Sequence, residues 1–173
     1  MAVEFNKRIA LTGFMGVGKS SVARHLAHAL GCERTDLDNV IEENENRTIV
    51  DIIDTDGEAR YREIETSNLE RVVGDDNVKI LSLGGGAWTV GRNREMLKNS
   101  GFTSVWLESS FEHCWMNMKF SHKVRPLAKN KRTAQKLFDE RQKIYCLADW
   151  HFVVKPEFTS FDVANRIIEE LFP

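Results

Sequence analysis

The stretch that most constrains the fold of this chain is "LTGFMGVGKSS", residues 11–21. It contains the pattern G-x-x-x-x-G-K-S at residues 13–20, directly after the apolar run "IAL". Glycines let backbone N–H groups turn inward around a phosphate, and a following helix presents the positive end of its dipole to that anion. A Gly-rich turn without a ligand is the alternative. The strand-like run before the pattern and the helix-like run after it favour a phosphate-binding loop.

The side chains of this loop suit a nucleotide. Lys19 can reach the outer phosphates, and the hydroxyl of Ser20 can bind Mg²⁺. The residues that we expect to bind the nucleotide through the loop are Gly13, Gly16, Val17, Gly18, Lys19, Ser20 and Ser21.

Hydrophobic periodicity predicts strands that alternate with helices along the chain. The expected strands cover residues 7–11, 33–38, 78–83, 102–108 and 151–154. The expected helices cover residues 19–30, 48–57 (capped by Thr48), 58–73, 89–99, a segment that begins after Ser109 or Ser110, 132–148 and 161–172. Such alternation predicts an α/β fold in which helices cover both faces of a parallel sheet. We therefore expect a three-layer P-loop sandwich with a central parallel five-stranded sheet.

Two carboxylates follow the second expected strand, where ligands of parallel sheets bind. Asp36 and Asp38 flank Leu37, and strand alternation would put both carboxylates on one side of an extended segment. One could hold Mg²⁺ through water, and the other could accept the proton of an attacking hydroxyl. The alternative is a polar strand end with a helix cap at Asp38.

Two further patterns suggest substrate contacts. Gly84, Gly85 and Gly86 follow the third strand, and a ligand close to the backbone would explain three glycines better than a flexible strand exit. Arg62 could bind a carboxylate as a planar fork. Because Glu58 and Glu65 stand four residues before it and three after it, surface ion pairs are the alternative.

A basic segment follows the helix expected after Ser109 or Ser110 and runs into the helix expected over residues 132–148. Residues 119–138 contain no acid, and their middle part, "SHKVRPLAKNKR", is polar and carries a proline. This composition suits a lid, over about residues 119–131, that closes over polyphosphate. A solvated basic loop is the alternative. The basic residues of the segment are Lys119, Lys123, Arg125, Lys129, Lys131, Arg132 and Lys136.

Composition excludes several function classes. The 173 residues carry a net charge of -2, which gives no electrostatic support to nucleic-acid or membrane-surface binding. No apolar run approaches the roughly 20 residues of a membrane span. The beginning, "MAVEFNKRIAL", lacks the layout of a signal peptide. Three widely spaced cysteines form no metal pattern and suggest unpaired thiols in the cytoplasm.

Taken together, these motifs resemble those of the shikimate kinase family over nearly the whole chain. The shared motifs, in the family's order and spacing, are "GFMGVGKSS", "DLD", "GEARYREIE", "LSLGGGA", "RPLA" and "DERQKIYCLAD". The resemblance implies a single P-loop kinase domain over residues 1–173, with a substrate-binding helical region at about 37–73. It also implies transfer of the γ-phosphoryl group of ATP to the 3-hydroxyl of shikimate, with Mg²⁺ as cofactor, in a monomer.

The resemblance also implies residue roles. Ser20 and Asp36 would serve Mg²⁺, and Asp38 would contact the reacting hydroxyl. Arg62 and Arg141 would clamp the shikimate carboxylate, with Gly84, Gly85 and Gly86 along its ring. Lys19 and Arg125 would stabilise the transferring phosphoryl group.

This sequence also departs from the family pattern. Met118, followed by Lys119, stands where an arginine often stacks on adenine, and Tyr61 and Ile53 stand where other aromatic residues are common. A kinase of another polyol acid such as gluconate, or a non-catalytic nucleotide-binding paralogue, remains an alternative. The presence of Lys19, Ser20, Asp36, Asp38 and Arg125 argues against the paralogue.

Overall fold

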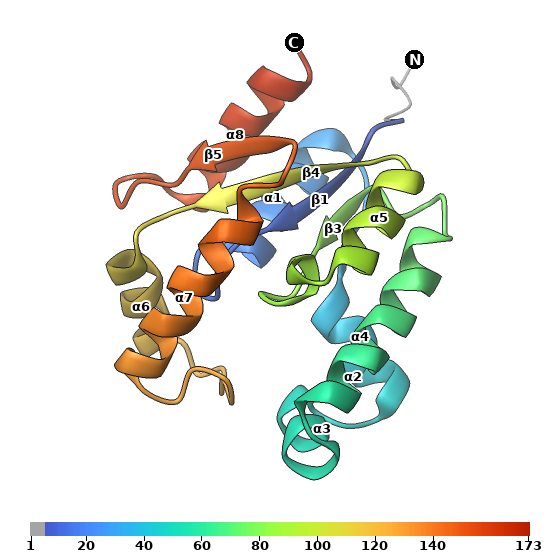
Figure 1. Ribbon diagram of the computed structural model, residues 1–173. Helices are drawn as coiled ribbons and strands as arrows, with labels where there is room; N and C mark the ends of the chain where they lie inside the picture. The colour runs from blue at the N-terminus through green and yellow to red at the C-terminus, as the bar shows by residue number, and fades with distance from the viewer. Residues whose placement is uncertain (1–5) are drawn as a thin grey trace.

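Five strands form one parallel sheet in the computed structural model, which describes residues 6–173. The order across the sheet is β2-β3-β1-β4-β5, so the central strand β1 pairs with β3 on one side and β4 on the other (Figure 1). The predicted parallel five-stranded sheet is confirmed. The strands are β1 (Arg8–Thr12), β2 (Arg34–Asp36), β3 (Ile80–Ser82), β4 (Phe102–Glu108) and β5 (Trp150–Val153). Residues 1–5, which belong to the segment judged not to be a signal peptide, lie outside the described residues.

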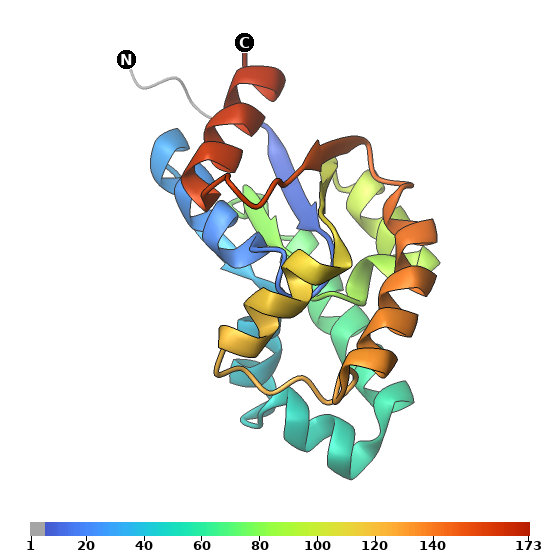
Figure 2. The same ribbon diagram turned by 90° about the vertical axis from the view of Figure 1, so that its left-hand side faces the viewer.

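Helices cover both faces of the sheet, as predicted. Figure 2 shows α1 and α8 on one face and α5 and α7 on the other, with the strands between them. All five residues of β1 are buried, and its three central residues, Ile9, Ala10 and Leu11, are apolar, as expected for a strand covered on both faces. The helices are α1 (Lys19–Leu30), α2 (Leu37–Glu45), α3 (Ile49–Asp56), α4 (Glu58–Val73), the 3₁₀ turn η1 (Ala87–Thr89), α5 (Gly91–Asn99), α6 (Phe111–Phe120), α7 (Lys131–Tyr145) and α8 (Ser160–Leu171).

Side-chain caps set the beginnings of several helices. Thr48 accepts a hydrogen bond from the N–H of Asp51, which confirms it as the cap of α3. Of the two serines proposed for α6, Ser110 is the cap, because its hydroxyl accepts from the N–H of His113. Such caps satisfy N–H groups that the first turn of a helix leaves unpaired.

The prediction of one extended segment over residues 33–38 is wrong. Strand β2 ends at Asp36, and α2 begins at Leu37, so Asp38 lies in the first helical turn. The reason is local: one carboxylate oxygen of Asp36 accepts the N–H groups of Asp38 and Asn39, at 3.1 and 3.4 Å, and caps the helix. The alternation of side chains expected for a strand therefore stops at the beginning of α2.

Two groups of elements face each other beyond the carboxyl ends of the strands. Helices α2, α3 and α4 occupy residues 37–73 on one side, and α6 with the irregular residues 121–130 lies on the other (Figure 1). The expected helix over 132–148 ends earlier, at Tyr145, and the one over 89–99 begins later, at Gly91, after the separate turn η1. This arrangement leaves the phosphate loop at the base of the opening.

Candidate active site

A cavity of about 850 Å³ opens between the two groups of elements. Its walls come from the loop after β1, from α2 to α4, from the glycines after β3 and from residues 121–127. The predicted site residues that line it are Gly16, Gly18, Lys19, Ser20, Ser21, Asp36, Asp38, Arg62, Gly84, Gly85, Gly86, Arg125 and Arg141. Gly13 and Val17 do not line it, and Val17 is buried in the core instead.

The phosphate loop depends on its glycines for two reasons. Gly13 and Gly16 have positive φ angles of 145° and 80°, which side chains with a Cβ rarely adopt. A Cβ on Gly13 would also lie 2.7 Å from the carbonyl oxygen of Leu107, and one on Gly16 would lie 2.5 Å from that of Cys114. The loop is thus packed tightly against β4 and α6, which holds its shape.

Lys19 folds back over this loop. Its Nζ donates to the carbonyl oxygens of Gly13 and Phe14, at 2.6 and 3.1 Å. Burial lowers the pKa of Lys19 to about 8, and nearby Asp38 acts in the opposite direction. Lys19 lines the floor of the cavity. An anion bound there would raise the pKa of the ammonium group again.

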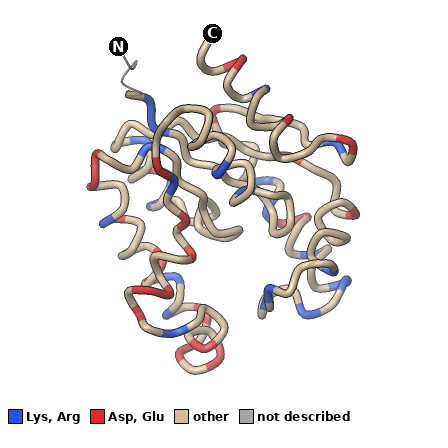
Figure 3. Tube along the Cα trace, turned by 180° about the vertical axis from the view of Figure 1, so that it is seen from behind, with Lys and Arg blue, Asp and Glu red and all other residues tan. Residues whose placement is uncertain are grey.

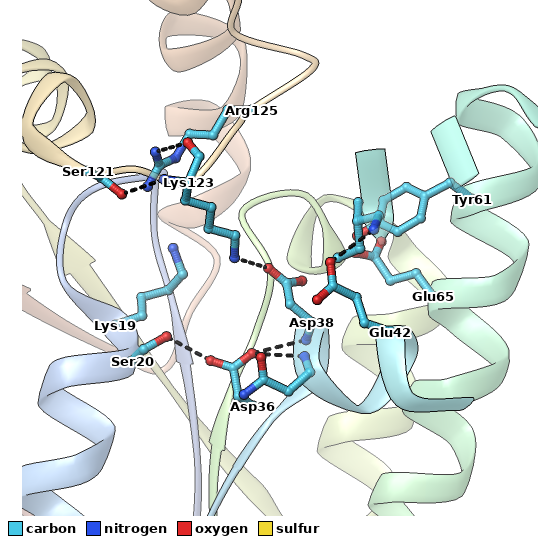
Figure 4. A network of polar contacts seen from close by, with 12 residues as sticks. Lys19, Ser20, Asp36, Asp38, Glu42, Tyr61, Glu65, Ser121, Lys123 and Arg125 are labelled. Atoms are coloured by element: carbon cyan, nitrogen blue, oxygen red, sulfur yellow. Dashed lines mark hydrogen bonds and ion pairs between the residues drawn. The ribbon is translucent and has the colours of Figure 1, made fainter. Parts of the chain in front are cut away.

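Ser20 and Asp36 form an oxygen pair beside the loop. The hydroxyl of Ser20 donates to Oδ2 of Asp36 at 2.7 Å, while Oδ1 of Asp36 caps α2 (Figure 4). No group of three His, Cys, Asp or Glu side chains suited to a metal occurs within residues 6–173. Two oxygen groups are nevertheless what Mg²⁺ uses in nucleotide sites, where phosphates and water complete the coordination. The residues present therefore fit Mg²⁺.

Asp38 reaches into the cavity from the first turn of α2. Its Oδ2 lies 3.0 Å from Nζ of Lys123, and its Oδ1 is buried with no hydrogen-bond partner among the described residues. Figure 4 shows this pair crossing the cavity, with Lys19 and Arg125 nearby. The sequence did not single out Lys123, because it is one of seven basic residues in its segment and no pattern distinguishes it.

Arg62 is held in a fixed orientation on α4. Its Nη1 donates to Oε1 of Glu65 at 2.7 Å, and its Nη2 lies 3.5 Å from Glu58. Tyr61 donates its hydroxyl to the other oxygen of Glu65 at 3.0 Å. Both glutamates expected near Arg62 are thus paired with it. The pair with Glu65 is not a surface ion pair, because the Glu65 side chain is fully buried. Gly86 leaves room for the guanidinium, because a Cβ there would overlap it.

Arg141 enters the cavity from α7 on the far side of the glycines. Its side chain is buried, and a Cβ on Gly85 would lie 3.1 Å from its Nη1. One turn later, Tyr145 donates its hydroxyl to the carbonyl oxygen of Gly85. Tyr145 was not recognised from the sequence, although its position four residues after Arg141 puts both on one helix face. Two arginines thus approach the glycine segment 84–86 from different helices.

Arg125 lines the opposite wall of the cavity, whereas Met118 lies in the core behind the phosphate loop. Nη1 of Arg125 donates to the backbone oxygen of Lys123 at 3.0 Å, and burial lowers the pKa of Arg125 while Asp38 opposes the shift. Met118 is buried, and its Cγ would lie 3.0 Å from a Cβ on Gly16. The thioether at this position therefore packs on the phosphate loop, and the neighbouring Lys119 is exposed.

The sheet order and the glycine loop between β1 and α1 give the protein the fold of the P-loop kinases. Within that class, a sequence model described as shikimate kinase matches residues 15–172. The chain belongs to the shikimate kinase family. It is 34% identical to the shikimate kinase of Persephonella marina, over 94% of this chain and 97% of the relative.

Solved structures agree with this assignment. The shikimate kinase of Acinetobacter baumannii, solved in complex with shikimate, superposes with a TM-score of 0.89 at 32% identity, covering 98% of this chain and 95% of that one. The Aquifex aeolicus enzyme gives a TM-score of 0.77 at 30% identity, with 95% of each chain covered. A gluconokinase from Sinorhizobium meliloti, at 17% identity and a TM-score of 0.55, shares the fold alone. Along residues 6–173, no helix combines the length and the apolar character that crossing a membrane requires.

Proposed function

We propose that this protein transfers the γ-phosphoryl group of ATP to the 3-hydroxyl of shikimate, giving shikimate 3-phosphate. The observation that supports this most directly is the position of Asp38 between a phosphate loop and two arginines that converge on residues 84–86. Asp38 thus lies between a site for the phosphates of the donor and a site for the carboxylate of the acceptor. In that position it can act on a hydroxyl of the acceptor. Membership of the shikimate kinase family identifies the acceptor.

The acceptor would bind on the side of the cavity formed by α4 and α7. Arg62 and Arg141 would clamp its carboxylate, since a guanidinium offers planar, charge-assisted donors to a carboxylate. Glu65 would keep Arg62 aimed at it. The glycines at 84–86 would run along the ring, where any Cβ would displace either a carboxylate or a guanidinium that the site needs.

The donor would bind on the loop between β1 and α1. Inward N–H groups and the N-terminus of α1 would hold the phosphates, with Ser20 and Asp36 as the residues for Mg²⁺, which neutralises phosphate charge when bound. Asp38 would accept the proton of the attacking hydroxyl as the new P–O bond forms and ADP departs. Lys19 and Arg125 would stabilise the charge on the phosphoryl group during transfer, and positioning would supply most of the rate.

The proposal also gives a role to each part of the chain. Residues 1–173 would act as one P-loop kinase domain, with residues 37–73 binding the acceptor and residues 119–131 closing over the phosphates as a lid. Closure would exclude water, which competes with the acceptor for the phosphoryl group. The cytoplasmic location and the monomeric state stay predictions from the sequence.

A coupled assay of ADP release tests the proposal. With ATP and Mg²⁺ present, we expect turnover that depends on shikimate and saturates with it, and none above background with gluconate. Turnover with gluconate but not shikimate would point to a kinase of another polyol acid. An enzyme that binds ATP yet releases no ADP with either acceptor would point to a non-catalytic paralogue.

A further inference from the structure

We infer that Lys123 is a positioning residue that couples the lid segment 119–131 to the carboxylate of Asp38 and aims that carboxylate at the acceptor. The inference rests on the proposed function, because it assigns Asp38 to the acceptor hydroxyl. It concerns a residue that acts through Asp38 and not by contact with the phosphates.

The first observation is the contact itself. Lys123 and Asp38 stand 85 residues apart in the chain, and their Nζ and Oδ2 atoms lie 3.0 Å apart across the cavity. Among the polar contacts recorded within residues 6–173, this is the one by which residues 121–130 reach the helical region 37–73. Of these polar contacts, the side chain of Lys123 therefore makes the one that links the lid segment to α2.

The second observation is that the two carboxylate oxygens of Asp38 have different surroundings. Oδ2 of Asp38 is occupied by Lys123, whereas Oδ1 is buried and unpaired among the residues described. Oδ1 faces the glycine segment, since a Cβ on Gly84 would lie 2.7 Å from it. Rotation about the last bond of an aspartate is soft, so one ionic contact is enough to choose which oxygen points at the acceptor. Lys123 makes that choice and leaves Oδ1 for the hydroxyl.

The third observation concerns the main chain around Lys123. The N–H of Lys123 donates to the hydroxyl of Ser121 at 3.2 Å, and its carbonyl oxygen accepts from Nη1 of Arg125 at 3.0 Å (Figure 4). Lys123 is thus the centre of a short bonded turn that also orients Arg125. With the Lys123 ammonium on Asp38, Arg125 lies at the wall of the same cavity.

Charge on the two sides favours this meeting. Lys and Arg recur along the lid segment, and Asp and Glu recur along α2 and α3 across the opening (Figure 3). Attraction between opposite charges brings the two surfaces together. The Lys123–Asp38 pair determines how the lid segment is aligned with α2. The Lys123 side chain remains 57% exposed, and exposed ion pairs are weak. The contact can therefore form and open in each catalytic cycle.

Kinetics of lysine variants test the inference. Lys123→Met keeps the length of the side chain and removes its charge, and we expect kcat to fall about 10- to 100-fold, the cost of a carboxylate misplaced by about 1 Å. KM for ATP should change less than about twofold, because Lys123 does not hold the phosphates in this arrangement. Lys123→Arg should recover most of kcat. Lys98→Met, the same change at an exposed position of α5 away from the cavity, should leave kcat as in the wild type.

A second measurement needs no turnover. In the protein without substrates, amide hydrogen exchange of residues 121–130 should be faster in Lys123→Met and in Asp38→Asn, and the double variant should be no faster than either. Wild-type kcat in Lys123→Met, or unchanged exchange in it, would overturn the inference. A wild-type protein that is inactive with shikimate would contradict the proposed function, while the exchange result would still decide whether the Lys123–Asp38 contact holds the lid.

Discussion

Arg62 donates a 2.7 Å hydrogen bond to Glu65, whose side chain is completely buried one turn further along α4. Burial raises the pKa of Glu65, and the guanidinium of Arg62 and the hydroxyl of Tyr61 act against that shift. A buried carboxylate is tolerated only when its oxygens are paired. The pair therefore fixes the direction of the arginine that we assign to the acceptor carboxylate.

Replacing this carboxylate should weaken acceptor binding. In Glu65→Gln, loss of a charge-assisted bond of about 1.5–3 kcal/mol frees Arg62, so KM for shikimate should rise about 10- to 100-fold while KM for ATP changes little. Steady-state kinetics with each substrate varied in turn would measure this. Glu63→Gln is the matched control, since Glu63 pairs with Arg60 at the surface of the same helix. Equal KM values in the two variants would contradict the role given to Glu65.

A single methyl group after β3 should damage catalysis more than folding. In Gly84→Ala, the new Cβ would lie 2.7 Å from Oδ1 of Asp38 and displace that carboxylate. We expect kcat to fall about 100-fold, with a thermal unfolding midpoint within a few degrees of the wild type. Gly91→Ala is the control, because its Cβ would meet only the end of the Arg94 side chain at 3.6 Å. A Gly84→Ala enzyme with normal kcat would show that Asp38 can move without consequence.

Asp38 should matter for chemistry and not for binding. Asp38→Asn keeps the shape of the side chain but removes its ability to accept the hydroxyl proton, so kcat should fall by about 10²–10⁴. Shikimate affinity, measured by calorimetry, should stay within about threefold of the wild type, because Arg62 and Arg141 supply the carboxylate contacts. Turnover comparable to that of the wild type would remove Asp38 from the mechanism.

Nucleotide binding should weaken at alkaline pH. Since burial lowers the pKa of Lys19 to about 8, the unliganded protein holds an ammonium below that pH and a neutral amine above it. Phosphates favour the ammonium, so the pKa rises on binding. ATP affinity should therefore be constant below about pH 8 and fall above it, by up to about tenfold per pH unit, with proton uptake on binding.

Calorimetry between pH 7 and pH 9.5, in buffers of different ionisation enthalpy, measures both quantities. Lys19→Arg provides the control, because a guanidinium stays charged throughout this range. Its ATP affinity, although lower at neutral pH, should not vary with pH. Wild-type binding without proton uptake at pH 9 would disprove the assignment.

Most of the fold could be predicted because its signals are local. The buried strand "RIALT", the cap at Thr48 and the apolar face of α8 each depend on residues within a few positions of one another. The segment around Asp36 was misjudged, because two opposing local rules apply there. Strand alternation and helix capping both suit D-L-D, and the hydrogen bonds to the Asp36 carboxylate favoured the helix.

From the sequence alone follow the phosphate loop, the strands and helices other than α2 and, through the motifs, the family to which the chain belongs. Packing between distant segments sets what no local pattern shows: the complete burial of Glu65, the hydrogen bond from Tyr145 to Gly85, and the ion pair of Lys123 with Asp38 across the cavity. The physical reason is range. Hydrogen-bonded turns and hydrophobic periodicity depend on neighbours in the chain, whereas an ion pair across a cavity depends on how two distant segments pack around it.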